Sequence, residues 1–72
     1  MVTVYSKHNC VQCKMTKRFL DQHHVAYTEI NLDEQPEFID HVKELGFAAA
    51  PVIETETESF SGFQPSKLKA LV

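Results

Sequence analysis

The chain has 72 residues, a formal net charge of −3 and 43% hydrophobic residues, a composition typical of one ordinary globular domain. No apolar stretch approaches the ~20 residues of a membrane span, and no basic region followed by an apolar core indicates a signal peptide. We therefore expect one monomeric domain over residues 1–72, without membrane contact and in the cytoplasm. In that compartment two cysteines are catalytic or metal-binding more often than structural.

The charges are segregated along the chain. Residues 1–20 contain four cations and no acid, whereas residues 21–72 contain all ten acids and three lysines. The four cations are Lys7, Lys14, Lys17 and Arg18. An electropositive site favours a thiolate and steers an acidic partner, and we assign Lys7 to tuning the thiolate. The other three have helical spacing and are expected to form a solvated helix face. This small cluster has no interleaved aromatic residues, so no nucleic-acid partner is expected.

The first elements predict a β-α-β unit. Residues 2–6 alternate as a strand does, and a helix follows over about residues 11–22. Its inward-facing side chains are expected to be Cys13, Thr16, Phe19 and Leu20. Residues 25–32 predict a second strand, whose apolar content indicates an interior position parallel to the first strand.

The second half adds two helices and a hairpin. Pro36 starts and Gly46 stops a helix over about residues 36–45. Two short strands, 51–54 and 59–61, follow, and a final helix runs from Pro65 to the end. Three glutamates at a spacing of two, Glu54, Glu56 and Glu58, are expected to share one exposed sheet face. The order β-α-β-α-β-β-α predicts an α/β fold of the thioredoxin/glutaredoxin type, with a four-stranded mixed sheet flanked by three helices.

The motif Cys10-Val11-Gln12-Cys13 lies where the first strand meets the first helix. Free N–H groups and the helix dipole stabilise negative charge there. The thiol pKa should therefore fall from about 8.5 into the range of roughly 3.5–7.5 found in such motifs. Disulfide exchange needs an accessible attacking thiol and a second thiol that releases the mixed disulfide. We therefore predict Cys10 as the nucleophile and Cys13 as the resolving thiol of a thioredoxin-like redox domain.

The Ala50-Pro51 bond enters a strand after a helix, which makes it a candidate cis peptide bond. It stands where the thioredoxin fold keeps its cis-proline loop beside the cysteine motif. In that fold the proline ring crowds the sulfurs, and the preceding backbone pairs with the partner's chain. We predict a cis bond, and the alternative is a trans proline that starts an edge strand.

Together these residues resemble the NrdH-redoxin family of small glutaredoxin-like proteins. The matching segments are Cys10-Val11-Gln12-Cys13, Leu45-Gly46-Phe47, Ala50-Pro51-Val52 and Ser61-Gly62-Phe63, followed by Pro65. The resemblance implies a dithiol-disulfide oxidoreductase that is reduced by thioredoxin reductase with electrons from NADPH. It implies delivery of those electrons to the large subunit of class Ib ribonucleotide reductase, with no bound cofactor. The partner-contacting residues it implies are Val11, Gln12, Ala50, Pro51, Ser61, Gly62 and Phe63.

The chain departs from the family at two positions. Phe60 replaces a frequent tryptophan, so the packing is kept while an N–H donor is lost. Gln64 replaces a frequent arginine, which removes a charge and a rigid donor group. Hydrogen bonding around this loop is the property that the two departures affect.

Two other functions remain as alternatives. A glutathione-dependent glutaredoxin has the same fold, but the acid expected to meet the glutathione amino group is missing from residues 61–64. A metal-carrier domain also places C-x-x-C before its first helix, but its order is β-α-β-β-α-β. A zinc site would need His23 and His24, which lie roughly 20 Å along the helix from Cys10. His8 is the one histidine close enough to tune the thiol, and a solvated loop position is the favoured interpretation for it.

Overall fold

Four strands form a mixed sheet in the computed structural model, which describes residues 1–72. The strands are β1 (Val2–Ser6), β2 (Tyr27–Asn31), β3 (Val52–Glu54) and β4 (Ser59–Ser61). Their order across the sheet is β2-β1-β3-β4. β2 is parallel to β1, whereas β3 is antiparallel to both β1 and β4. The mixed four-stranded sheet predicted from the sequence is confirmed.

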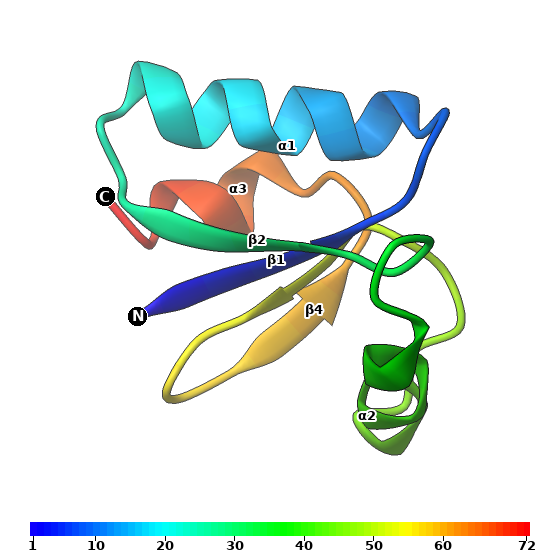
Figure 1. The fold of residues 1–72 in the computed structure, drawn as a ribbon. Coiled ribbons are helices and arrows are strands. Elements are labelled where there is room, and N and C mark those ends of the chain that lie inside the picture. The colour runs from blue at the N-terminus through cyan, green and yellow to red at the C-terminus, as the bar shows by residue number, and fades with distance from the viewer.

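The helices cover both faces of this sheet (Figure 1). They are α1 (Val11–Gln22), the short 3-10 helix η1 (Pro36–Phe38), α2 (Ile39–Glu44) and α3 (Pro65–Lys69). Figure 1 shows α1 and α3 side by side on one face and α2 on the other. The element order is the predicted β-α-β-α-β-β-α. The longest helix has 12 residues, so none is long and apolar enough to cross a membrane.

Alternation along β1 and β3 produces two cores, because successive side chains of a strand point to opposite faces. Val4 and Ile53 belong to the cluster that also contains residues of α1 and α3. Tyr5 and Val52, one position along each strand, belong to the cluster under α2. The central strands therefore connect the two helical layers and hold the ends of β1 and β3 in fixed register.

The predicted interior position of the second strand is wrong. β2 pairs with β1 alone and forms an edge of the sheet. The apolar residues that suggested an interior strand, Val25 and Leu32, lie just outside it and pack into the two cores. The strand itself has an exposed centre at Thr28 and Glu29, which an edge strand tolerates and an interior strand does not.

Two predicted helix boundaries also need correction. The predicted helix 36–45 is divided into η1 and α2, and Phe38 lies at the junction with φ −86° and ψ −5°. No side chain caps the start of either piece, so nothing favours a regular α-helical first turn after Pro36. The last helix ends at Lys69 rather than at the chain end, although Leu71 still packs against the core.

The three glutamates do not share a sheet face. Glu54 ends β3, whereas Glu56 and Glu58 lie in the turn before β4. The Oγ1 of Thr55 accepts hydrogen bonds from the N–H groups of Thr57 and Glu58 and stabilises this turn. Only Glu54 of the three therefore lies in the sheet, which removes the like-charge crowding expected on one face.

Candidate active site

Cys10 occupies the N-cap position of α1, with φ −112° and ψ 104°. Its Sγ accepts a hydrogen bond from the backbone N–H of Cys13 at 3.1 Å, and the two residues form a disulfide. An N-cap side chain faces unpaired N–H groups and the positive end of the helix dipole. After reduction, the same donors would stabilise a thiolate at position 10.

The two sulfurs differ in their access to solvent. Cys10 is half-buried at the helix end, whereas Cys13 is only 1% exposed on the inner face of α1. A disulfide partner can therefore reach Cys10 more readily than Cys13. This difference is what the predicted division into attacking and resolving thiols requires.

The loop before Cys10 is attached to the loop after β2, which the sequence did not indicate. The N–H of His8 donates to the Oδ2 of Asp33 at 2.7 Å, and Asn9 adopts a left-handed backbone with φ +55°. The Asn31 side chain in turn accepts from the N–H of Asp33 at 2.9 Å. The only available sequence signal was the Asn-x-Asp spacing, which is typical of a side-chain-bonded turn. His8 itself lies 3.7 Å from Glu34, with both side chains more than half exposed.

The Ala50-Pro51 peptide bond is cis, as predicted. Pro51 is fully buried. Ala50 is half-buried, and neither its N–H nor its C=O has a hydrogen-bond partner. Unpaired backbone groups beside a strand can pair with an incoming extended chain. The backbone of Ala50 therefore remains free for such pairing.

Three segments far apart in the sequence meet at the active site. The Oε1 of Gln12 accepts a hydrogen bond from the N–H of Phe63 at 3.3 Å. The neighbouring N–H of Gly62 donates to the C=O of Pro51 at 2.8 Å. Gly62 has φ +81°, a conformation that favours glycine. These bonds bring together the predicted site residues of the cysteine motif, the cis-proline loop and the Ser61-Gly62-Phe63 segment.

The two family departures are accommodated without an unpaired group. Phe60 is buried at 3% exposure, and the Nζ of Lys67 lies 5.5 Å from its ring centroid. The side-chain amide of Gln64 donates to the C=O of Ser61 at 2.6 Å. Gln64 therefore supports the loop locally, in place of the expected arginine.

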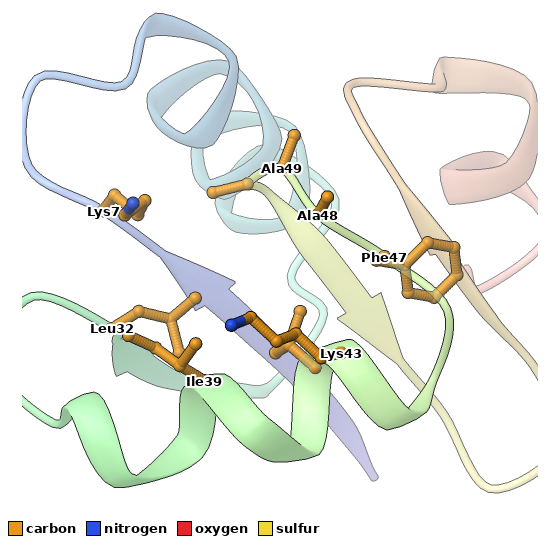
Figure 2. Close-up of a pocket in the computed structure, with 9 residues that line it drawn as sticks. Lys7, Leu32, Ile39, Lys43, Phe47, Ala48 and Ala49 are labelled. Atoms are coloured by element: carbon orange, nitrogen blue, oxygen red, sulfur yellow. The ribbon is translucent and has the colours of Figure 1, made fainter.

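An apolar pocket of about 110 Å³ lies between α2 and the segment before Pro51 (Figure 2). Its lining residues are Lys7, Leu32, Ile39, Val42, Lys43, Phe47, Ala48, Ala49 and Ala50. Figure 2 shows Lys7 at the end of β1 and Lys43 on α2 at this pocket. The structure places Lys7 at the pocket, and its predicted role in thiolate tuning stays a prediction. Val11, next to Cys10, is 70% exposed.

Lys17 does not belong to a freely solvated face, in contrast to the prediction. Its Nζ lies 2.8 Å from the Oε2 of Glu29, which also accepts from the buried hydroxyl of Ser6 at 2.8 Å. The hydrogen bond from Lys17 is the main cause that lowers the pKa of the Glu29 carboxyl. The hydrogen bond from Ser6 lowers this pKa to a smaller extent, whereas burial raises it. Lys14 and Arg18 are exposed, as predicted.

His41 on α2 is half-exposed and connects this helix to the sheet. Its Nε2 lies 3.0 Å from the Oε1 of Glu54, which also accepts from the Tyr5 hydroxyl at 2.8 Å. The hydrogen bond from His41 is the main cause that lowers the pKa of Glu54. Burial and the hydrogen bond to Glu54 raise the pKa of Tyr5 to about 12. This Tyr5-Glu54-His41 cluster attaches α2, one wall of the pocket, to the sheet.

The structure offers no alternative centre. No three His, Cys, Asp or Glu side chains lie together in a way that could hold a metal ion. The element order also differs from the β-α-β-β-α-β order of metal-carrier domains.

Comparison with known proteins gives one consistent family. The glutaredoxin family model matches residues 2–60. The glutaredoxin-like protein NrdH of Lactococcus lactis subsp. cremoris is 61% identical over 71 residues, which cover 99% of each chain. NrdH of Escherichia coli K12 is 34% identical over 70 residues, which cover 97% of this chain and 86% of that protein.

Solved structures agree with this result. The NrdH-redoxin of Escherichia coli, described as a glutaredoxin-like protein with a thioredoxin-like activity profile, superposes with a TM-score of 0.94 at 34% identity and covers 99% of this chain and 93% of its own. A glutaredoxin from Archaeoglobus fulgidus superposes with a TM-score of 0.87 at 29% identity and covers 97% of this chain and 83% of its own.

Proposed function

Because this chain belongs to the glutaredoxin family as a NrdH-type thiol–disulfide oxidoreductase, we propose that it carries electrons from thioredoxin reductase to class Ib ribonucleotide reductase. NADPH supplies these electrons through the reductase, and the chain itself binds no cofactor. The large subunit of ribonucleotide reductase, whose active-site disulfide forms at each turnover, is the acceptor. The observation that carries the proposal is the accessible N-cap Cys10, disulfide-bonded to the buried Cys13.

The reaction begins with the reduced dithiol. The Cys10 thiolate attacks one sulfur of the acceptor disulfide, and the other acceptor sulfur leaves as a thiolate that takes up a proton. Cys13 then attacks the Sγ of Cys10, and the remaining acceptor sulfur leaves with the electron pair. The acceptor ends as a dithiol and the Cys10-Cys13 pair as a disulfide. Thioredoxin reductase returns the pair to the dithiol by the reverse exchange.

We place the acceptor's chain along the cis-proline loop. The unpaired N–H and C=O of Ala50 support this placement, because an extended segment could form backbone hydrogen bonds with them. The apolar pocket beside Ala50 fits an apolar side chain of that segment, and Lys7 and Lys43 at the pocket favour a neighbouring acid. The exposed side chain of Val11 would contact the same partner.

Thioredoxin reductase is proposed in preference to glutathione because of the segment beside the site. Ser61, Gly62, Phe63 and Gln64 contain no carboxylate to meet the amino group of glutathione. Both the NADPH-dependent reductase and ribonucleotide reduction belong to the cytoplasm, and we propose that the protein works there.

A coupled NADPH-oxidation assay tests this function. The protein is supplied with a disulfide acceptor and either thioredoxin reductase or glutathione plus glutathione reductase. We expect rapid NADPH oxidation with thioredoxin reductase, little with the glutathione system, and none with the Cys10→Ser variant in either. A strong response only with glutathione would replace the proposal by the glutathione-dependent alternative. Class Ib ribonucleotide reductase is then used as the acceptor, and deoxyribonucleotide formation should require the protein.

A further inference from the structure

The hydroxyl of Thr16 is the single buried side-chain nitrogen or oxygen of the molecule that has no hydrogen-bond partner. Thr16 is fully buried, at 0% exposure. A buried hydroxyl without a partner destabilises the fold, since it has lost its bonds to water. A valine of nearly the same shape would remove this cost. The cysteines are joined as a disulfide in this structure. In this oxidised state the Thr16 hydroxyl makes no hydrogen bond that would offset the cost of its burial.

Thr16 lies three residues after Cys13 on the buried face of α1. Residues three apart on a helix have Cβ atoms about 5–6 Å from each other. Helical side chains also lean toward the N-terminus, so that of Thr16 extends over the turn that contains Cys13. A change of χ1 between staggered rotamers moves the hydroxyl relative to this turn. Its usual alternative, the carbonyl four residues earlier, is not hydrogen-bonded to it here.

Two other polar groups, the Lys17 ammonium and the Ser6 hydroxyl, are already paired with the carboxylate of Glu29. Cys13 is only 1% exposed, so water does not readily supply a donor to its sulfur. The Thr16 hydroxyl, one helical turn after Cys13, is thus a buried donor without a partner.

We propose that Thr16 donates a hydrogen bond to the Sγ of Cys13 when the disulfide is reduced, and loses this partner when the disulfide forms. Once the disulfide is reduced, the sulfur of Cys13 accepts a hydrogen bond weakly as a thiol and strongly as a thiolate. The Thr16 hydroxyl would therefore stabilise the reduced protein relative to the oxidised one. This inference rests on thiol–disulfide exchange alone and is independent of which reductase or acceptor the protein uses.

The same bond assists the second step of the exchange. The Cys13 thiol gives up the proton that the departing partner sulfur will take up, and the resulting thiolate attacks the Sγ of Cys10, which is joined to the partner's sulfur. The Cys10-Cys13 bond forms, the bond from Cys10 to the partner breaks, and the partner sulfur leaves with the electron pair and takes up a proton. The Thr16 hydroxyl stabilises the transient Cys13 thiolate in its nearly dry surroundings.

The redox equilibrium of Thr16→Val and Thr16→Ser against dithiothreitol tests the proposal. Loss of one net hydrogen bond in the reduced form should shift the equilibrium constant of Thr16→Val toward the disulfide by about fivefold to tenfold. A tenfold shift corresponds to about 30 mV for this couple. Thr16→Ser keeps the hydroxyl and should stay near the parent. An unchanged equilibrium in Thr16→Val would overturn the proposal, because a hydroxyl that is unpaired in both states affects both equally.

Kinetics provide a second readout that distinguishes this role from general packing. In stopped-flow measurements, Thr16→Val should lengthen the lifetime of the mixed disulfide about fivefold to tenfold. In a Cys13→Ser background, which removes the resolving sulfur, Thr16→Val should leave the rate of attack by Cys10 unchanged. An equal slowing of that attack would assign Thr16 to the structure of α1 and contradict the proposal.

Discussion

At the residue scale, Cys10 is half-buried at the N-cap of α1, whereas Cys13 is only 1% exposed. We expect Cys10→Ser to lose all attack on a disulfide substrate, because the remaining sulfur is buried. Cys13→Ser should still attack and then stop as a mixed disulfide, because no resolving thiol remains. Mass spectrometry after incubation with a disulfide substrate detects the adduct, and the parent protein, which should show none, is the control. An adduct on Cys13 in the Cys10→Ser variant would reverse the roles.

At the scale of elements, the Tyr5-Glu54-His41 cluster attaches α2 to the sheet. The stabilisation that this cluster gives to the fold should depend on pH. The folded-state pKa of Glu54 is lowered, chiefly by His41. The stabilisation is therefore present above the unfolded pKa and is lost as pH falls through the folded pKa, below 4.5. The pKa of Tyr5 is raised to about 12. The contribution of Tyr5 to folding stability is therefore fully present below about pH 10 and is lost as pH rises through about 12.

Urea unfolding of Glu54→Gln measures this contribution. The variant should lose about 1–3 kcal/mol at pH 7, the size of hydrogen bonds to a charged group. The difference from the parent should shrink as pH falls through the lowered pKa of Glu54, because the parent's carboxylate then becomes protonated. Glu58→Gln is the matched control, since this glutamate is exposed in the same hairpin and its side chain has no partner. Equal losses in the two variants would show that charge alone, and not the cluster, stabilises α2.

At the scale of the whole molecule, the charge segregation of the sequence is only partly kept in space. Lys7, Lys14 and Arg18 are exposed and form no ion pair, but Glu29 neutralises Lys17. Asp33 is hydrogen-bonded to the loop that precedes Cys10. The field that an acidic partner meets at the active site is therefore weaker than the run of cations suggests. Lys7 is the member of that run at the pocket beside Ala50, where Lys43 of α2 also lies.

Encounter with thioredoxin reductase should therefore weaken with salt. The Debye length falls from about 10 Å at 0.1 M to about 3 Å at 1 M, so steering between the two surfaces is lost. We expect kcat/KM to decrease with ionic strength, and Lys7→Gln to lower it and to reduce the fraction of Cys10 present as thiolate. Lys14→Gln, an exposed cation outside the pocket, is the control for net charge. Salt-independent kcat/KM together with an unchanged thiolate titration in Lys7→Gln would assign Lys7 to the solvated surface.

The sequence by itself determined the features that depend on neighbouring residues. The first strand and first helix were predicted with their observed bounds, because alternation and helical periodicity are local properties. Cys10 was placed at the helix start for the same reason, and proline chemistry indicated the cis bond before Pro51.

Only the tertiary structure decided the features that depend on distant contacts. The edge position of β2 depends on which strands pair, and no local pattern encodes that choice. The bonds of Glu54 to His41 and Tyr5 join residues 13 and 49 positions away in the chain. The missing partner of Thr16 is likewise a property of the packed core, because a helix pattern shows that a side chain is buried but not what surrounds it.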